Sequence, residues 1–193
     1  MATAAPLPPD RYPHEARLRD GRPLTLRLMT PSDAPRIVAF GRGLPEDDLL
    51  FLRMDITDPD AVNQWVRNLE AELSTTVIAE ADGAIAGYAA LVRNRVTWQR
   101  HLGEIRLLVG QRHRAQGLGR LLAGEVFALG RSLGLRKIVA QMTPDQKGAI
   151  NTFERLGFQP EALLQDFVVD RAGRPRDLVV MAYDVTGLTE HLD

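Results

Sequence analysis

Apolar residues recur along this chain in two periods, one typical of helices and one typical of strands. The clearest helical period begins at Gly117 and ends near Gly134, a favoured residue just past a helix end. Its apolar positions are Leu118, Leu121, Leu122, Val126, Leu129 and Leu133. A second helix is predicted after Asp58-Pro59, because an acid followed by proline is a strong helix start. Its apolar positions are Val62, Trp65, Val66, Leu69 and Leu73.

Two further helices are predicted, from Thr30-Pro31 to about Phe40 and over residues 145–156. Short β-branched or alternating segments between turn residues predict strands at 16–19, 24–28, 75–79, 84–93, 102–109, 137–142, 162–169 and 177–185. Residues 43–55 are predicted as a short helix and loop. The order is therefore β-β-α-α-β-β-β-α-β-α-β-β. It favours a mixed α/β (α+β) fold with helices packed on one sheet.

Composition places the chain in a single ordinary domain. It has 193 residues, 45% of them apolar and 25% charged. Four prolines within residues 1–13 predict a loose tail, and residues 14–193 are predicted as the domain. No cysteine is present, which excludes disulfides, thiolate-bound zinc and cysteine nucleophiles. No metal-ligand spacing, apolar span or signal-peptide pattern occurs, so we expect a cytoplasmic protein with no metal and no membrane partner.

Charge is balanced overall but unevenly spread. The net charge of −1 argues against a nucleic-acid partner. Residues 93–120 carry seven arginines and one acid, Glu104, whereas residues 46–72 carry eight acids and two arginines. An acidic run such as 46–60 is usually a solvated face. It could also rim a site and attract a cationic amine or a basic peptide.

A candidate phosphate loop joins the strand at 102–109 to the helix after Gly117. Helix N-termini offer unpaired N–H groups, and glycines allow a ligand to approach the backbone closely. Arg112, Arg114 and Arg120 add positive charge. These features predict a pyrophosphate site; the alternative is a glycine helix start with solvated arginines. Two other nucleotide sites are excluded, since Leu122 replaces the third Rossmann glycine and no Gly-Lys-Ser/Thr is present.

Three motifs in order resemble the GNAT superfamily of acetyl-CoA-dependent N-acetyltransferases. They are Glu104-Ile-Arg-Leu-Leu-Val109, Arg114-Ala-Gln-Gly-Leu-Gly119 and AINTFERLGF at 149–158. The resemblance covers about residues 24–185. It implies a mixed, largely antiparallel sheet of six to seven strands flanked by about four helices, with acetyl-CoA as co-substrate. The N-terminal part, GRPLTLRLMTPSDA followed by LPEDDLLFLR, is more loosely similar to bacterial Pat-type protein-lysine acetyltransferases.

The resemblance also implies which residues bind CoA. Leu107, Leu108 and Val109 would present their backbone to the pantetheine arm, and a bulge near the last two would free an N–H for the oxyanion. The pyrophosphate would be held by Arg114, Ala115, Gln116, Gly117, Leu118, Gly119 and Arg120. Gln146 and Phe153 stand where relatives often carry asparagine and a tyrosine that protonates the thiolate. Phe153 has no proton to donate.

Glu104 is the candidate base for the amine. A lysine amine has a pKa of about 10.4, so a neutral nucleophile requires a proton acceptor. The alternative is a surface glutamate paired with Arg106 or Arg93. Since no cysteine can carry the acetyl group, direct transfer in a ternary complex is favoured.

The sequence leaves the acceptor open between a protein lysine or N-terminus, a polyamine-like metabolite and an aminoglycoside-like drug. A homodimer is compatible with it. The alternative function is a non-catalytic acyl-CoA-binding module, for which the missing tyrosine is the argument.

Overall fold

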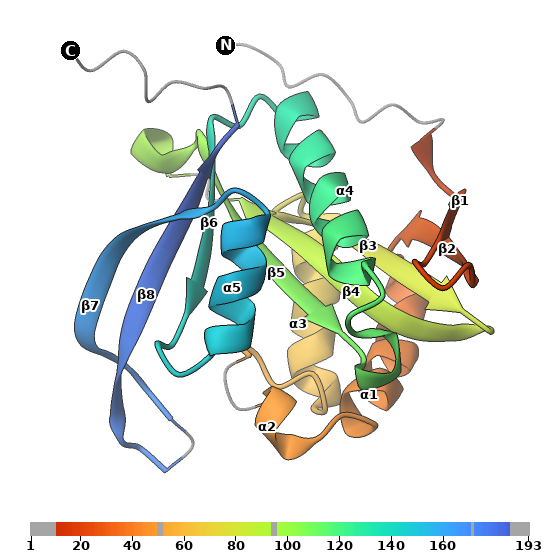
Figure 1. Cartoon of the computed structure of the whole chain (residues 1–193), viewed down its shortest axis with the longest axis horizontal. Helices are drawn as coiled ribbons and strands as arrows, with labels where there is room; N and C mark the ends of the chain where they lie inside the picture. Colours follow the sequence, from red (N-terminus) through yellow and green to blue (C-terminus); the bar gives the residue numbers. More distant parts are fainter. Residues whose placement is uncertain (1–10, 50–51, 94–95, 171, 186–193) are drawn as a thin grey trace.

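The computed structural model describes residues 11–49, 52–93, 96–170 and 172–185. Within them, one eight-stranded sheet has the order β1-β2-β3-β4-β5-β6-β8-β7 (Figure 1). The strands are β1 (His14–Arg17), β2 (Pro23–Leu28), β3 (Ser74–Ala81), β4 (Ala84–Arg93), β5 (Leu102–Val109), β6 (Lys137–Met142), β7 (Gln159–Val169) and β8 (Pro175–Asp184). The mixed, largely antiparallel sheet is confirmed. The count of six to seven is too low, because the short β1 and the whole β7–β8 hairpin extend the same sheet.

Strand pairing is antiparallel except between β5 and β6. That parallel pair is short, running only from Leu102 opposite Lys137 to Glu104 opposite Val139. Beyond it the two strands point apart (Figure 1). β5 remains paired with β4 over its whole remaining length, up to Val109 opposite Gly87.

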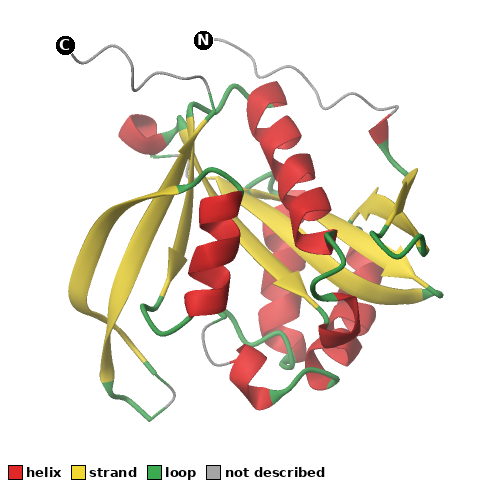
Figure 2. Ribbon diagram, viewed as in Figure 1, coloured by secondary structure: helices red, strands yellow, loops and turns green. Residues whose placement is uncertain are grey.

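Helices cover both faces of the sheet (Figure 2). They are α1 (Ala34–Arg42), the one-turn α2 (Glu46–Leu49), α3 (Pro59–Glu70), α4 (Leu118–Ser132) and α5 (Lys147–Arg155). Three 3₁₀ turns accompany them: η2 (Pro31–Asp33), η3 (Thr97–Gln99) and η4 (Gln111–His113). The helix predicted from Thr30 thus begins as a 3₁₀ turn. No helix in the described residues is long and apolar enough to cross a membrane.

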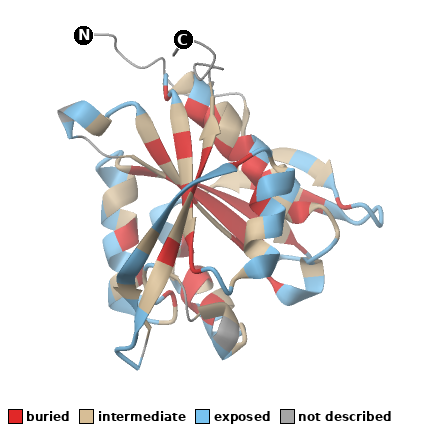
Figure 3. Cartoon of the chain, turned by 60° about the vertical axis from the view of Figure 1, so that its left-hand side comes forward, coloured by how far each residue is buried: buried red, intermediate tan, exposed pale blue. Residues whose placement is uncertain are grey.

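Each face of the sheet has its own hydrophobic core. α4 contributes Leu118, Leu122, Val126 and Leu129 to one core, as its sequence period predicts. On the other face, Trp65 of α3 packs on Tyr88 of β4, with ring centroids 5.0 Å apart, and its Nε1 donates to Thr76 Oγ1. Figure 3 shows the buried stretches in the middle strands, while the edge strand β7 is largely exposed.

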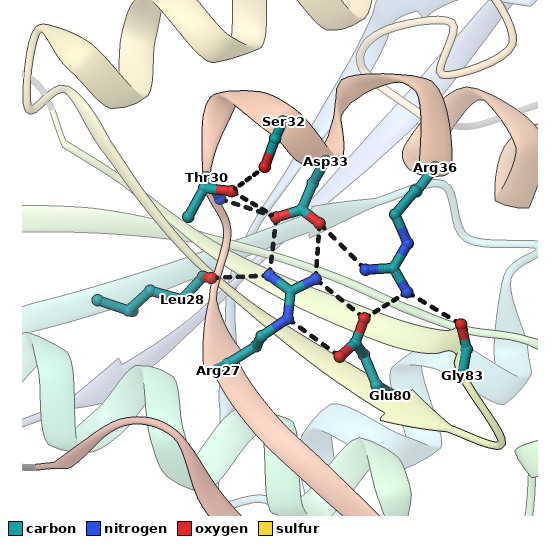
Figure 4. A network of polar contacts seen from close by, with 8 residues as sticks. All are labelled: Arg27, Leu28, Thr30, Ser32, Asp33, Arg36, Glu80 and Gly83. Atoms are coloured by element: carbon teal, nitrogen blue, oxygen red, sulfur yellow. Dashed lines mark hydrogen bonds and ion pairs between the residues drawn. The ribbon is translucent and has the colours of Figure 1, made fainter.

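A network of ion pairs joins β2, β3 and the start of α1 (Figure 4). The Arg27 guanidinium donates to both oxygens of Asp33, at 2.6 and 2.7 Å, and to both oxygens of Glu80. Arg36 contacts Asp33 and Glu80 as well. Asp33 is only 2% exposed, yet its carboxylate is fully hydrogen-bonded, so its burial is tolerated. Arg27 lowers the pKa of Asp33 to about 2.

The first residues that the structure describes lie against α4. Arg11 Nε and the Tyr12 hydroxyl both donate to Oε2 of Glu125, at 2.9 and 2.6 Å. Arg11 and Tyr12, which the sequence assigns to a loose tail, are therefore docked on the domain. Residues 1–10 of the predicted tail and 186–193 of the predicted domain lie outside the described residues.

Asp33→Asn should destabilise the fold by about 3 kcal/mol at pH 7, because it leaves Arg27 without its best-buried partner. The folded pKa of Asp33, about 2, lies below its ordinary 3.8. Its contribution is therefore present above pH 4 and is lost as the pH falls toward 2. Denaturant titrations at pH 7, 4 and 2.5 should show the two proteins converging in stability. Asp20→Asn, which breaks the exposed pair with Arg22, is the control and should change little. An unchanged gap at pH 2.5 would contradict this role.

Candidate functional site

The parting of β5 from β6 leaves one edge of β5 without a strand partner. The N–H of Gly110 donates to Ala86 O at 2.9 Å, and opposed residues in an antiparallel pair alternate in direction. By that alternation, Leu108 turns its backbone toward β4, while Leu107 and Val109 turn theirs toward the gap. Arg114 Nε donates to Val109 O at 3.1 Å, as expected for a carbonyl that faces away from β4.

The expected bulge near Leu108 or Val109 is not present. Pairing of β4 with β5 keeps one register from Gly103 to Val109. The free N–H groups arise instead because β6 leaves β5, so they belong to Leu107 and Val109. Of the three residues expected to present their backbone to pantetheine, Leu108 instead turns its backbone toward β4.

A cavity of about 120 Å³ lies where the two strands part. Side chains from both faces of the sheet line it. From the face covered by α1 and α3 come Trp65, Tyr88, Glu104 and Arg106, and from the face covered by α4 and α5 come Leu107, Met142, Ala149 and Phe153. The cavity therefore connects the two faces of the sheet. A ligand bound along β5 and a second ligand entering from the opposite face could come into contact in it.

Glu104 lies in this cavity with one oxygen engaged and one available. Its Oε1 contacts Arg53 Nε at 3.1 Å and Arg106 Nε at 3.0 Å. Its Oε2 accepts no hydrogen bond from any residue that the structure describes. Of the two partners considered from the sequence, Arg106 is found and Arg93 is not, because the Arg93 guanidinium donates to Glu72 O. Arg53 was missed, since nothing in the sequence links it to a residue so far along the chain.

The loop before α4 presents a run of free backbone donors. Ala115 and Gly117 have φ values of +60° and +86°, a left-handed conformation that turns successive N–H groups to one side. Across the described part of the chain, the N–H groups of residues 115–119 donate no hydrogen bond. With the α4 N-terminus behind them, these donors are of the kind that binds anions.

Arginines surround this loop in different roles. Arg114 is a structural anchor, bonded to Val109 O and paired with Asp48 at 2.6 Å. Arg112 and Arg120 are exposed and form no ion pair with a described residue. Sequence reasoning missed Arg19, from the β1–β2 turn, whose N–H donates to Gln116 O at 3.0 Å and whose side chain lies beside Gly117.

Gln146 and Phe153 both line the cavity from the α5 side. The Gln146 carboxamide oxygen accepts from the N–H of Thr143 at 2.9 Å, which fixes the turn before α5. Phe153 is 8% exposed and packs edge-on against Phe158, with centroids 4.9 Å apart. No proton can therefore come to the cavity from this position.

Tyr88 reaches the cavity, although its strand pattern predicts only a half-buried aromatic. It is 4% exposed, and its hydroxyl makes no hydrogen bond with a described residue. Burial raises the pKa of this phenol, so it keeps its proton. Among the described residues, no group of three or more His, Asp or Glu side chains could hold a metal ion.

A split strand pair beside a loop of free N–H groups defines a protein that binds an extended, phosphate-bearing ligand. The family model for the acetyltransferase (GNAT) family matches residues 42–158, more than half of the chain. The protein therefore belongs to the GNAT family, whose members are acetyl-CoA-dependent N-acetyltransferases.

The individual relatives share only a modest part of their sequence with this chain. Streptothricin acetyltransferase of Streptomyces lavendulae is 30% identical over 89 residues, so the chain spans about half (46%) of that relative's length. The GNAT domain of S. lividans PAT has a TM-score of 0.74 at 20% identity, covering 91% of this chain and 98% of that one. YncA of Salmonella typhimurium, solved with its cofactor acetyl-CoA, has a TM-score of 0.72 at 22% identity, covering 84% and 94%. These solved structures share the fold.

Gly119→Asp should weaken CoA binding at least tenfold, because it adds a negative charge beside the free N–H groups of 115–119. Gly119→Ala is the matched control. A Cβ there would lie 3.8 Å from Leu107 Cδ2 and Val109 Cγ2, an ordinary contact, so the fold should accept it. Calorimetry with CoA measures both variants. Equal affinity of Gly119→Asp and Gly119→Ala would show that pyrophosphate binds elsewhere.

Proposed function

We propose that the protein transfers the acetyl group of acetyl-CoA directly to a primary amine, with Glu104 as the base. The observation that supports this most is Oε2 of Glu104, a carboxylate oxygen without a hydrogen-bonding partner among the described residues, beside the gap in the sheet. Arg53 and Arg106 hold the other oxygen and so fix the orientation of the carboxylate.

In this proposal the CoA pyrophosphate binds the N–H groups of residues 115–119. The pantetheine arm then follows the open edge of β5, where the backbone groups of Leu107 and Val109 replace the contacts that β6 no longer makes. That path brings the thioester to the cavity, next to Glu104. Gln146 and Phe153 enclose it from α5.

The reaction requires a neutral amine, but at pH 7 roughly one lysine-type amine in 2,500 is neutral. Glu104 accepts the ammonium proton, and the neutral nitrogen then attacks the thioester carbonyl. The C–N bond forms and the oxyanion is stabilised by a β5 N–H that faces the gap; the nitrogen then gives its second proton to water as the C–S bond breaks. The thiolate leaves and takes its proton from water, because Phe153 has none to give.

The acceptor is a protein lysine or a small amine. A non-catalytic acyl-CoA-binding module is the competing function, favoured only by Phe153. Release of free thiol from acetyl-CoA in the presence of amines separates the two, since a binding module releases none.

Glu104→Gln keeps the shape of the side chain but removes its basicity. The rate should fall about 10²–10⁴-fold while CoA affinity stays within twofold. Steady-state thiol release from pH 6 to 9.5 should also show a smaller loss at high pH, where more amine is already neutral. Glu154→Gln, an exposed change on α5, is the control. A normal rate at pH 7 would reduce Glu104 to a structural ion-pair partner.

Phe153→Tyr restores the hydroxyl that relatives often carry, and we expect less than a threefold gain in turnover. A thiol with a pKa of about 8.5 leaves readily as the thiolate near neutral pH, so an acid adds little. The new hydroxyl also enters a mostly apolar surface beside Phe158. Single-turnover rates measure the chemical step. A gain of tenfold or more would show that the missing acid limits this protein.

A further inference from the structure

The charge of the cavity does not suit a simple cationic acceptor. Among the described residues, its charged lining consists of Arg53, Glu104 and Arg106, two positive groups and one negative. A protonated amine that enters meets an excess of positive charge. An acceptor with no anionic group of its own is therefore poorly matched to this site.

The acidic segment of the sequence does not correct this imbalance. Asp48 is paired with Arg114 at 2.6 Å, and Asp58 caps α3 by accepting from Asp60 N. The residues of this segment that line the cavity are Leu52, Arg53 and Met54, which are apolar or basic. Among the described residues of this segment, no acid lines the cavity, while Asp48 and Asp58 make contacts within the fold.

Two polar groups in the cavity have unused hydrogen-bonding capacity. Arg106 donates through Nε to Glu104, while its Nη groups donate to no described residue. Tyr88 lies on the same face, opposite Leu108 and so two positions along from Arg106, and its hydroxyl has no hydrogen-bonding partner among the described residues. A guanidinium fork and a phenol O–H together are donors suited to a carboxylate.

We propose that the acceptor is a small amino carboxylate, with its amine on Oε2 of Glu104 and its carboxylate on Arg106 and the Tyr88 hydroxyl. This rests on the proposed function. Glu104 and Arg106 are two residues apart on one face of β5, and Arg106 Nε contacts Glu104 Oε1 at 3.0 Å. Oε2 and the Nη groups therefore lie close together, which suits an amine and a carboxylate joined through one or two carbons. Such an acceptor is a zwitterion, so its own carboxylate offsets the excess positive charge of the cavity.

The acceptor class is tested with matched sets of compounds. Thiol release from acetyl-CoA is measured with each standard α-amino acid, its carboxamide and its decarboxylated amine, and with spermidine and a lysine peptide. At least one amino acid should exceed its carboxamide and its decarboxylated amine tenfold or more in kcat/KM. The carboxamide is a stringent comparison, because its amine is less basic and reacts faster wherever the carboxylate is not used.

Two variants test the assigned contacts. Arg106→Gln and Tyr88→Phe should each raise the KM for the preferred amino acid fivefold or more. In each variant the loss in kcat/KM should be at least fivefold greater for the amino acid than for its decarboxylated amine, because a general loss of structure or of Glu104 orientation would lower both equally. Arg136→Gln, an exposed charge change outside the cavity, is the control.

The outcomes separate this inference from the function it rests on. Faster acetylation of spermidine, the lysine peptide or amines without a carboxylate would overturn the amino-carboxylate acceptor and leave the acetyltransferase intact. Equal losses on acids and decarboxylated amines in both variants would overturn the contacts. No thiol release with any acceptor would overturn the proposed function itself.

Discussion

The separation of β5 from β6 after three paired positions is the constraint on which the site depends. Backbone groups in a sheet must find partners, and a strand that loses its neighbour keeps a row of donors and acceptors. β4 holds β5 in register up to Val109, so this open edge is rigid. Arg114 occupies Val109 O and ties the open edge to the loop before α4. The strand gap and the proposed anion site are therefore linked directly through Arg114.

Two arginine–carboxylate clusters on the same chain show the difference between structural and functional charge. Around Arg27 and Asp33, the carboxylate oxygens are bonded and the aspartate is almost fully buried. Such a closed network fixes α1 against the sheet and has no group left for a ligand. In the cluster around Glu104, its Oε2 accepts no hydrogen bond from a described residue. The Nη groups of Arg106 likewise donate to no described residue. These unused groups in a cavity are the basis for the proposed binding site.

Sequence patterns predicted well the features that depend on near neighbours. The α4 stripe, the Asp58 cap and the glycine loop are local, and each was found at the predicted place. The strands were mostly placed within a few residues, but the full order of the strands in the sheet was not predicted, because pairing β5 with β6 joins distant segments. For the same reason, nothing in the sequence indicated that Arg53 contacts Glu104 or that Arg19 lies beside the loop before α4. The sequence placed Tyr88 in a strand, but only the three-dimensional structure shows that it lines the cavity, where it packs against Trp65.

This difference also explains why family membership identifies the acyl donor but not the acceptor. The proposed donor site uses mostly one contiguous segment, from β5 through the loop to α4, and such a segment is recognisable in any relative that retains it. The proposed acceptor side instead combines Arg53, Trp65 and Tyr88, which come from three separate segments, with Glu104 and Arg106 of β5. Each can change without disturbing the loop. Acceptor choice can therefore diverge while the donor site stays constant, and it must be inferred from the charges and free hydrogen-bonding groups of this particular cavity.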